Sequence, residues 1–140
     1  MPRIYPEVPL TEVMGEIASV PRRYERITEY SGSFEVASGL ITGSTIVTLL
    51  PNVYSRDILS LRTYLSTALG DVWNFYILDS EYRKVYINEL IPKGVTEIID
   101  SNLRIPVSGN LIVVFRYAKP LPTTITVSFC IGTREIVLEV

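Results

Sequence analysis

The C-terminal stretch from Asn110 to Val140 constrains the fold more than any other part of the chain. It contains two runs rich in β-branched and aromatic residues, NLIVVFRYA and ITVSFCIG, a proline-bearing KPLPTT between them, and a closing run, TREIVLEV. In ITVSFCI, apolar residues alternate with Thr, Ser and Cys, which is typical of an antiparallel strand with one buried face. NLIVVFRYA is apolar at odd and even positions, which predicts a strand covered on both faces. The stretch therefore predicts a β-sandwich core.

The preceding part of the chain continues this pattern of short β-rich runs separated by Gly, Pro and Asn turns. STIVTLL (44–50) reads as a strand that ends at Pro51-Asn52. ILSLRTYLST (58–67) fits both a helical face and an alternating strand, but its Thr and Tyr content and its neighbours favour the strand. We expect eight or nine strands in an all-β, antiparallel, jelly-roll-like β-sandwich.

Two runs in the middle of the chain, 72–78 and 82–90, predict a β-hairpin. We expect Trp73, Phe75 and Ile77 to face the core together with Val85 and Ile87. The outer face of the hairpin could bind a sugar, form a protein interface or simply stabilise an exposed sheet through tyrosine pairs. The side chains predicted on this outer face are Asn74, Tyr76, Tyr82, Lys84, Tyr86 and Asn88.

Residues 1–30 differ from the rest because prolines interrupt them at positions 2, 6, 9 and 21. We predict an extended N-terminal arm over 1–30, with at most a short helix over 11–19, followed by the sandwich domain over 31–140. The arm is too apolar to remain free in water, so we expect it to cover a surface of its own domain or of a neighbour. The arm residues proposed as interface contacts are Tyr5, Val8, Leu10 and Ile17.

No combination of residues in the chain points to catalysis. The sequence has no histidine, which removes the commonest general base and most zinc sites. Its single cysteine, Cys130, is interpreted as a packed thiol, and Asp79 with Glu81 as a solvated turn in preference to a calcium site. There is no phosphate-binding glycine motif. We expect no catalytic residues, no metal, no cofactor and no enzymatic activity.

The charge balance argues against nucleic acid as a partner, since the formal net charge is −2. Arg22, Arg23 and Arg26 cluster, but Glu25 and Glu29 interleave with them, which indicates a solvated or intersubunit charge patch. No run is long enough to span a membrane, and the chain does not open with a signal peptide, so we expect an unprocessed chain.

Three stretches, STIVTLLPN, IPKGVTEIIDSNLRIPVSGNLIVVFRY and TTITVSFCIG, together resemble the β-sandwich structural proteins of virus particles. In those proteins a proline- and glycine-turned IPxG hairpin precedes a buried strand and a Thr-rich penultimate strand. The resemblance covers about residues 44–131 and carries over no individual functional residue. It implies a non-enzymatic capsid, vertex or tail subunit that clasps neighbours with its arm, and hence a location in the virion.

The sequence supports two hypotheses about function. The first is a structural subunit that assembles with copies of itself or with other subunits, and the lack of His and Gln suits a virus of a thermophilic host. The alternative is a cytoplasmic carbohydrate- or peptide-binding module that uses the tyrosine face, with a glycan as its partner. The oligomeric state in solution separates the two.

Overall fold

The computed structural model describes residues 22–81 and 83–139, and these residues form nine strands and no helix. The predicted all-β antiparallel sandwich is confirmed, and so is the strand interpretation of 58–67. The strands are β1 Arg22–Val36, β2 Thr42–Val47, β3 Val53–Leu65, β4 Trp73–Asp79, β5 Val85–Ile91, β6 Glu97–Asp100, β7 Ile105–Pro106, β8 Leu111–Tyr117 and β9 Ile125–Glu139. Among the described residues no helix is long and apolar enough to cross a membrane.

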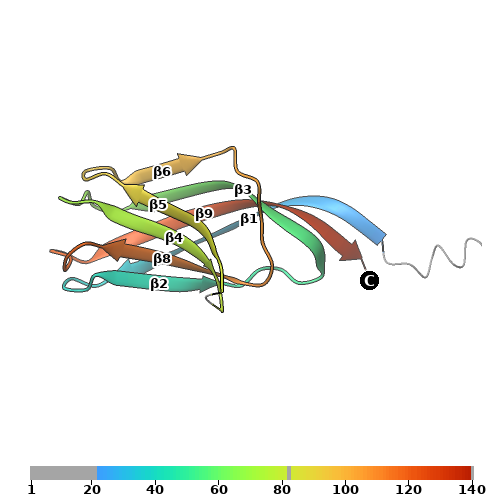
Figure 1. The fold of residues 1–140 in the computed structure, drawn as a ribbon, viewed down its shortest axis with the longest axis horizontal. Coiled ribbons are helices and arrows are strands. Elements are labelled where there is room, and N and C mark those ends of the chain that lie inside the picture. The colour runs from blue at the N-terminus through green and yellow to red at the C-terminus, as the bar shows by residue number, and fades with distance from the viewer. Residues whose placement is uncertain (1–21, 82, 140) are drawn as a thin grey trace, which may run out of the picture.

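The strands form two facing sheets, shown in Figure 1. The first, here called the β1 sheet, has the order β1-β9-β3-β6, and β7 also pairs with β3. The second, the β2 sheet, has the order β2-β8-β4-β5. The pairing is nested, since β1 pairs with β9, β2 with β8, β3 with β6 and β4 with β5. This is the order of a long hairpin rolled into two sheets, which is the jelly-roll arrangement.

The core lies between the two sheets and is built from the alternating inward side chains that the sequence predicts. Trp73 is fully buried, its ring centroid lies 5.7 Å from that of Phe115, and its Nε1 donates a hydrogen bond to the Val95 carbonyl at 3.0 Å. The buried indole therefore has a partner for its polar group. Other large side chains that are fully buried in this core are Phe75, Ile58, Leu61, Ile77, Leu111, Ile125 and Ile131.

The hairpin of β4 and β5 forms as predicted, but one inward residue was assigned wrongly. Ile77 pairs with Ile87, whereas Leu78 pairs with Val85, so the register shifts by one residue between them. This β-bulge changes which face the start of β5 presents. Val85 is consequently 56% exposed on the outer face, and Tyr86 is half-buried against the core.

Strand β9 joins two runs that the sequence analysis treated separately, ITVSFCIG and TREIVLEV, into one strand of fifteen residues. Gly132 lies at the junction, where β3 has a register shift next to Ser60. A Cβ atom at position 132 would collide with the Ser60 hydroxyl. The close contact between β9 and β3 therefore favours glycine here, and the strand continues through it.

The long strands carry the β1 sheet past the end of the β2 sheet, as the right-hand side of Figure 1 shows. We call this extension the ribbon; it consists of 22–28 of β1, 53–57 of β3 and 133–139 of β9. The predicted boundary between arm and sandwich at residue 30 falls inside β1, because residues 22–30 pair with β9. The predicted helix over 11–19 lies outside the described residues.

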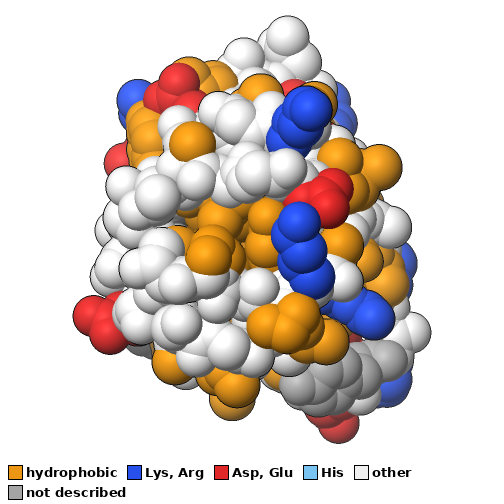
Figure 2. Space-filling model, turned by 90° about the vertical axis from the view of Figure 1, so that its left-hand side faces the viewer, with side chains coloured by type: hydrophobic (Ala, Val, Ile, Leu, Met, Phe, Trp, Pro, Cys, Tyr) orange, Lys and Arg blue, Asp and Glu red, His pale blue; other side chains and the backbone are white. Residues whose placement is uncertain are grey.

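The opposite end of the sandwich consists of connections between strands. Leu40 and Ile41 in the β1–β2 connection, Val72 before β4 and Val95 in the β5–β6 connection are all exposed. Figure 2 shows hydrophobic side chains gathered in the middle of this end, with Lys and Arg side chains beside them. Exposed apolar side chains are common on protein surfaces, and this end is a weaker candidate site than the groove between β1 and β2.

Candidate functional site: a groove between two sheet edges

One side of the sandwich is open because two edge strands meet there. β1 is the edge of its sheet and β2 the corresponding edge of the other. In the described part of the chain, neither strand has a partner on its outer side. Edge strands present unpaired backbone N–H and C=O groups, which can bind another extended chain.

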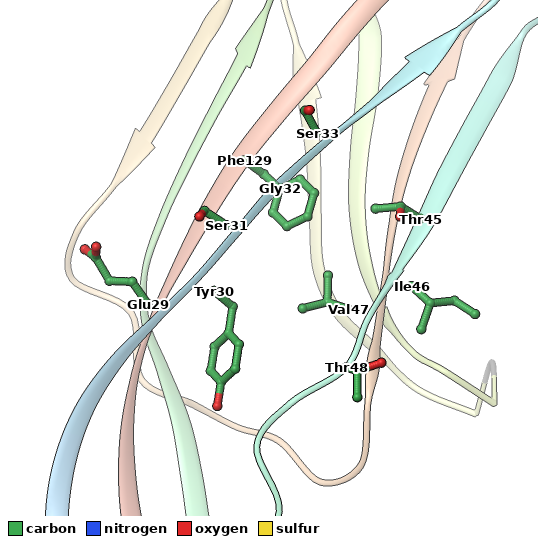
Figure 3. Close-up of a pocket in the computed structure, with 10 residues that line it drawn as sticks. All are labelled: Glu29, Tyr30, Ser31, Gly32, Ser33, Thr45, Ile46, Val47, Thr48 and Phe129. Atoms are coloured by element: carbon green, nitrogen blue, oxygen red, sulfur yellow. The ribbon is translucent and has the colours of Figure 1, made fainter.

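A groove of about 400 Å³ runs between these two edges (Figure 3). Its walls are residues 29–33 of β1 and 45–48 of β2, and Phe129 of β9 lies beneath them. Val47 and Phe129 are buried, whereas the Ser31, Gly32 and Ser33 edge is exposed. The groove therefore combines an apolar floor with two exposed backbone edges.

Gly32 allows the Phe129 ring to lie directly under the edge of the groove. The two residues are cross-strand partners, and an added Cβ at Gly32 would lie 3.0 Å from Cζ of Phe129. That distance is too short for an undisturbed ring, so a larger side chain at position 32 would displace the ring or itself. Because Gly32 and its neighbouring serines are small, the backbone of this edge stays exposed.

The side chains of the groove suit binding better than catalysis. Glu29 is the one ionisable acid among the lining residues, and the others are hydroxyl, aliphatic or aromatic apart from Gly32. No group of three or more metal-ligating His, Cys, Asp or Glu side chains occurs in residues 22–81 and 83–139. An apolar floor between free backbone edges fits an extended polypeptide, as in β-strand addition.

Tyr30 connects the groove to a buried charged network centred on Glu135. The Tyr30 hydroxyl donates to Oε2 of Glu135 at 2.5 Å and accepts from the Leu50 amide at 3.2 Å. Arg56 donates to the same carboxylate oxygen at 2.6 Å, and its Nη2 also donates to the Leu50 carbonyl at 2.6 Å. The network therefore ties the lower end of the groove to the β2–β3 connection.

The other carboxylate oxygen of Glu135 binds to β1. Arg26 donates to Oε1 through Nε at 2.9 Å and Nη2 at 2.7 Å, and Thr28 donates through its hydroxyl at 2.9 Å. Burial alone would raise the pKa of Glu135, but hydrogen bonds from Tyr30, Arg56, Arg26 and Thr28 lower it to about 2. The carboxylate is ionised and fully buried, and both neighbouring strands supply its donors.

Glu135 was not among the predicted site residues, although the sequence carries a signal for it. Ile131, Thr133 and Val137 share the inward face of β9 with it, so the alternation of that strand places an acid at a core position. Buried acids require partners. The arginine cluster contained one of them, Arg26.

The predicted arginine patch resolves into separate interactions within one chain. Arg26 binds Glu135, and the guanidinium of Arg23 stacks over the Tyr54 ring at 3.8 Å. Glu25 forms an ion pair with Arg134 across the ribbon. The side chain of Arg22 lies outside the described part. Arg26 is therefore a structural donor and not simply a solvated charge.

The predicted tyrosine face is only partly assembled. Tyr76 pairs with Asn88 and shares its strand face with Asn74, as expected. Tyr86 instead packs against the core, and its hydroxyl donates to the Ser108 carbonyl at 3.3 Å, because the β5 bulge turns it inward. Lys84 precedes β5, with Nζ 5.4 Å from the Tyr86 ring centroid. Tyr82 and the arm residues Tyr5, Val8, Leu10 and Ile17 lie outside the described residues, and their interface role stays a prediction.

The outer face of the β2 sheet is more apolar than the sequence analysis anticipated. One row crosses all four strands, because Ile46 pairs with Ile112, Ile112 with Leu78, and Leu78 with Val85. Ile46 is 64% exposed and Val85 56%, while Ile112 between them is buried. We call this set of four residues the apolar row.

Two further predicted residues occupy ordinary structural positions. Cys130 is half-buried, and burial raises the pKa of its thiol, which opposes nucleophilic reactivity. Asp79 is not solvated as predicted but buried, and it accepts a hydrogen bond from Nε of Arg83 at 3.0 Å. That bond lowers the pKa of the Asp79 carboxyl.

Comparisons with known proteins show only a general likeness of shape. No protein-family model and no curated protein matches the sequence. The chain is similar to a structure titled "Crystal Structure of FLHE", at 10% identity and TM-score 0.47 over 81% of this chain and 96% of that one. A pilus structure from Bacillus endospore appendages is similar at 10% identity and TM-score 0.48, over 81% of this chain and 91% of that one. A structure of the Gx strain of infectious bursal disease virus is similar at 13% identity and TM-score 0.34, over 86% of this chain and 32% of that one.

Proposed function

We propose that this chain is a non-enzymatic structural subunit that assembles with copies of itself, within a virus particle. The observation that carries the proposal is the apolar row on the outer face of the β2 sheet. The outer face of an antiparallel sheet in a solitary domain is normally solvated and polar. Here Ile46 and Val85 expose most of their surface at the two ends of a row that spans the sheet.

The charges on this face support a protein partner. Of the outward residues in its four strands, Arg116 is the only one that carries a charge. Depletion of charged residues is the compositional signature of the buried centre of an interface. The remaining outward residues are Thr42, Ser44, Val114, Asn74, Tyr76, Asn88 and Leu90.

A second copy is the partner best suited to this face. An apolar row that crosses a sheet can meet the same row of another copy across a two-fold axis, which makes the surface self-complementary. The formal net charge of −2 opposes such an association only weakly. The particle itself is supported by the jelly-roll strand order and by the sequence resemblance over residues 44–131.

Glycan binding, the second candidate, has less support from the geometry. A sugar platform needs an exposed aromatic ring, and Tyr76 is half-buried between Asn88 and Val114. Tyr86 lies against the core. Assembly through the apolar row therefore explains more of this surface than sugar stacking does.

Substitution of Val85 tests the proposal directly. Val85→Lys places a charge at the exposed β5 end of the apolar row and does not touch the groove, so sedimentation velocity should show loss of the oligomers formed by the unchanged protein. Ile27→Lys is a matched control, because Ile27 is 65% exposed on the ribbon, away from the apolar row. A monomeric parent protein, or equal assembly of Val85→Lys and the parent, would contradict the proposal.

A further inference from the structure

The groove between β1 and β2 lacks an occupant in the described part of the chain, although it has the features of a strand-binding site. Its floor is apolar, its β1 edge carries the small residues Ser31, Gly32 and Ser33, and both bordering strands have free outer edges. An added strand can make ladder hydrogen bonds to such an edge and direct alternate side chains onto the floor.

We infer that residues 10–20 of a second copy bind in this groove as an extended strand beside β1. This inference rests on the proposed self-assembly, since it requires a neighbouring copy. Proline cannot donate a ladder hydrogen bond, and the prolines at positions 2, 6, 9 and 21 leave Leu10–Val20 as the longest uninterrupted stretch before β1. In an extended strand Val13 and Ile17 lie on one face, which is the face that would meet Phe129 and Val47.

The turn needed before β1 and the positions of the prolines argue against binding of residues 10–20 in the groove of their own copy. A fold-back onto β1 with a turn over 18–21 would put residue 17 opposite Arg22 and Leu10 opposite Glu29. Pro9 and Pro6 would then lie along the groove, where they could not donate. A tighter turn at Pro21 is disfavoured, because two-residue hairpin turns need a positive φ that proline cannot adopt. A neighbouring copy has no such restriction.

Tyr30 is held in place in the β1 wall of the groove, which the added strand would contact. Its hydroxyl is held by Glu135 and by the Leu50 amide, so the lower end of the groove is shaped before a strand arrives. A preformed site reduces the entropy lost on binding. The buried network therefore shapes the groove through Tyr30, which belongs to both.

Disulfide trapping in the full-length chain tests the inference. Cys130 is first replaced by serine, because it pairs directly with Ser31 and could capture a new thiol. One tagged chain carries Ser33→Cys in the groove wall, and a second, differently tagged chain carries a single cysteine at each position from Leu10 to Val20 in turn. The two chains are co-expressed and oxidised, and linked dimers are mapped by mass spectrometry.

We expect interchain disulfides whose yield alternates with a period of two along residues 10–20. Ser55→Cys, an exposed serine of the ribbon, serves as the matched control and should give no links. Absence of interchain links would overturn the inference. A further sample carries both cysteines on one chain, and links that form only within that chain would also overturn it. If the protein assembles and Val85→Lys disrupts the assembly, but no links form, this inference fails and the proposed function stands. If the protein never assembles, the proposed function fails.

Discussion

The β1 sheet runs through two regions, the two-layered sandwich body and the ribbon, and different forces stabilise them. In the body, a second sheet covers the inward face, and most of the buried residues are apolar, as Trp73, Phe75 and Phe115 illustrate. In the ribbon the β2 sheet has ended, and the corresponding inward position on β9 is the carboxylate of Glu135. Its partners Arg26 and Arg56 come from the two flanking strands.

This difference shows what a sheet does when it loses its covering layer. Apolar burial needs a facing surface, whereas a carboxylate with donors on both sides can fix three strands laterally within one sheet. A buried ion pair contributes little net stability compared with apolar packing, but removal of one member leaves the others uncompensated. The body should therefore govern global stability, and the network should govern the order of the ribbon and of Tyr30 beside the groove.

The largest expected effect comes from breaking the body. Trp73→Ala should lower the free energy of unfolding by about 4 kcal/mol, because it leaves a cavity in the core and an unpaired Val95 carbonyl. Urea unfolding followed by circular dichroism measures this loss. The neighbouring Val72→Ala, at an exposed position, should change stability by less than about 0.5 kcal/mol. Similar values for the two variants would show that Trp73 is not a core residue.

Breaking the ribbon network should have a smaller effect that is concentrated in the ribbon. Glu135→Gln should lower the free energy of unfolding by about 3 kcal/mol, because two arginines, Tyr30 and Thr28 lose their common charged acceptor. Hydrogen exchange should accelerate most at residues 22–28 and 133–139. Glu81→Gln, whose exposed ion pair with Arg83 contributes little, is the control. Uniform acceleration over the whole chain would remove the distinction between body and ribbon.

Lowering the pH should have the smallest effect, and it should act mainly on the ribbon through protonation of Glu135. The folded pKa of Glu135 is about 2, below its ordinary value of 4.5, so its stabilising effect is complete above pH 4.5. That effect is lost as the pH falls from 4.5 through 2, and Asp79, whose pKa is also lowered, acts in the same direction. Urea midpoints measured over this range should fall more steeply for the parent protein than for Glu135→Gln. Parallel curves would exclude Glu135 as a source of acid sensitivity.

Side-chain alternation let the sequence predict the framework of the molecule. It placed Trp73, Phe75 and Ile77 in the core, paired β4 with β5 and identified a sandwich, since alternation depends only on neighbouring residues of one strand. It failed at Val85 and Tyr86, where a single inserted residue reverses the faces of the strand. No local pattern in VYINEL marks that bulge.

What the sequence determined by itself is the class of fold, because the period of two and the spacing of the turns are local properties that survive in any arrangement of the strands. The tertiary structure alone decided the site. Arg26 and Glu135 are 109 positions apart, and they meet only because β1 pairs with β9 in one particular register. The groove likewise exists because β1 and β2 both lie at sheet edges on the same side. Which strands become neighbours depends on the packing of the whole chain, so it cannot be read from any single segment.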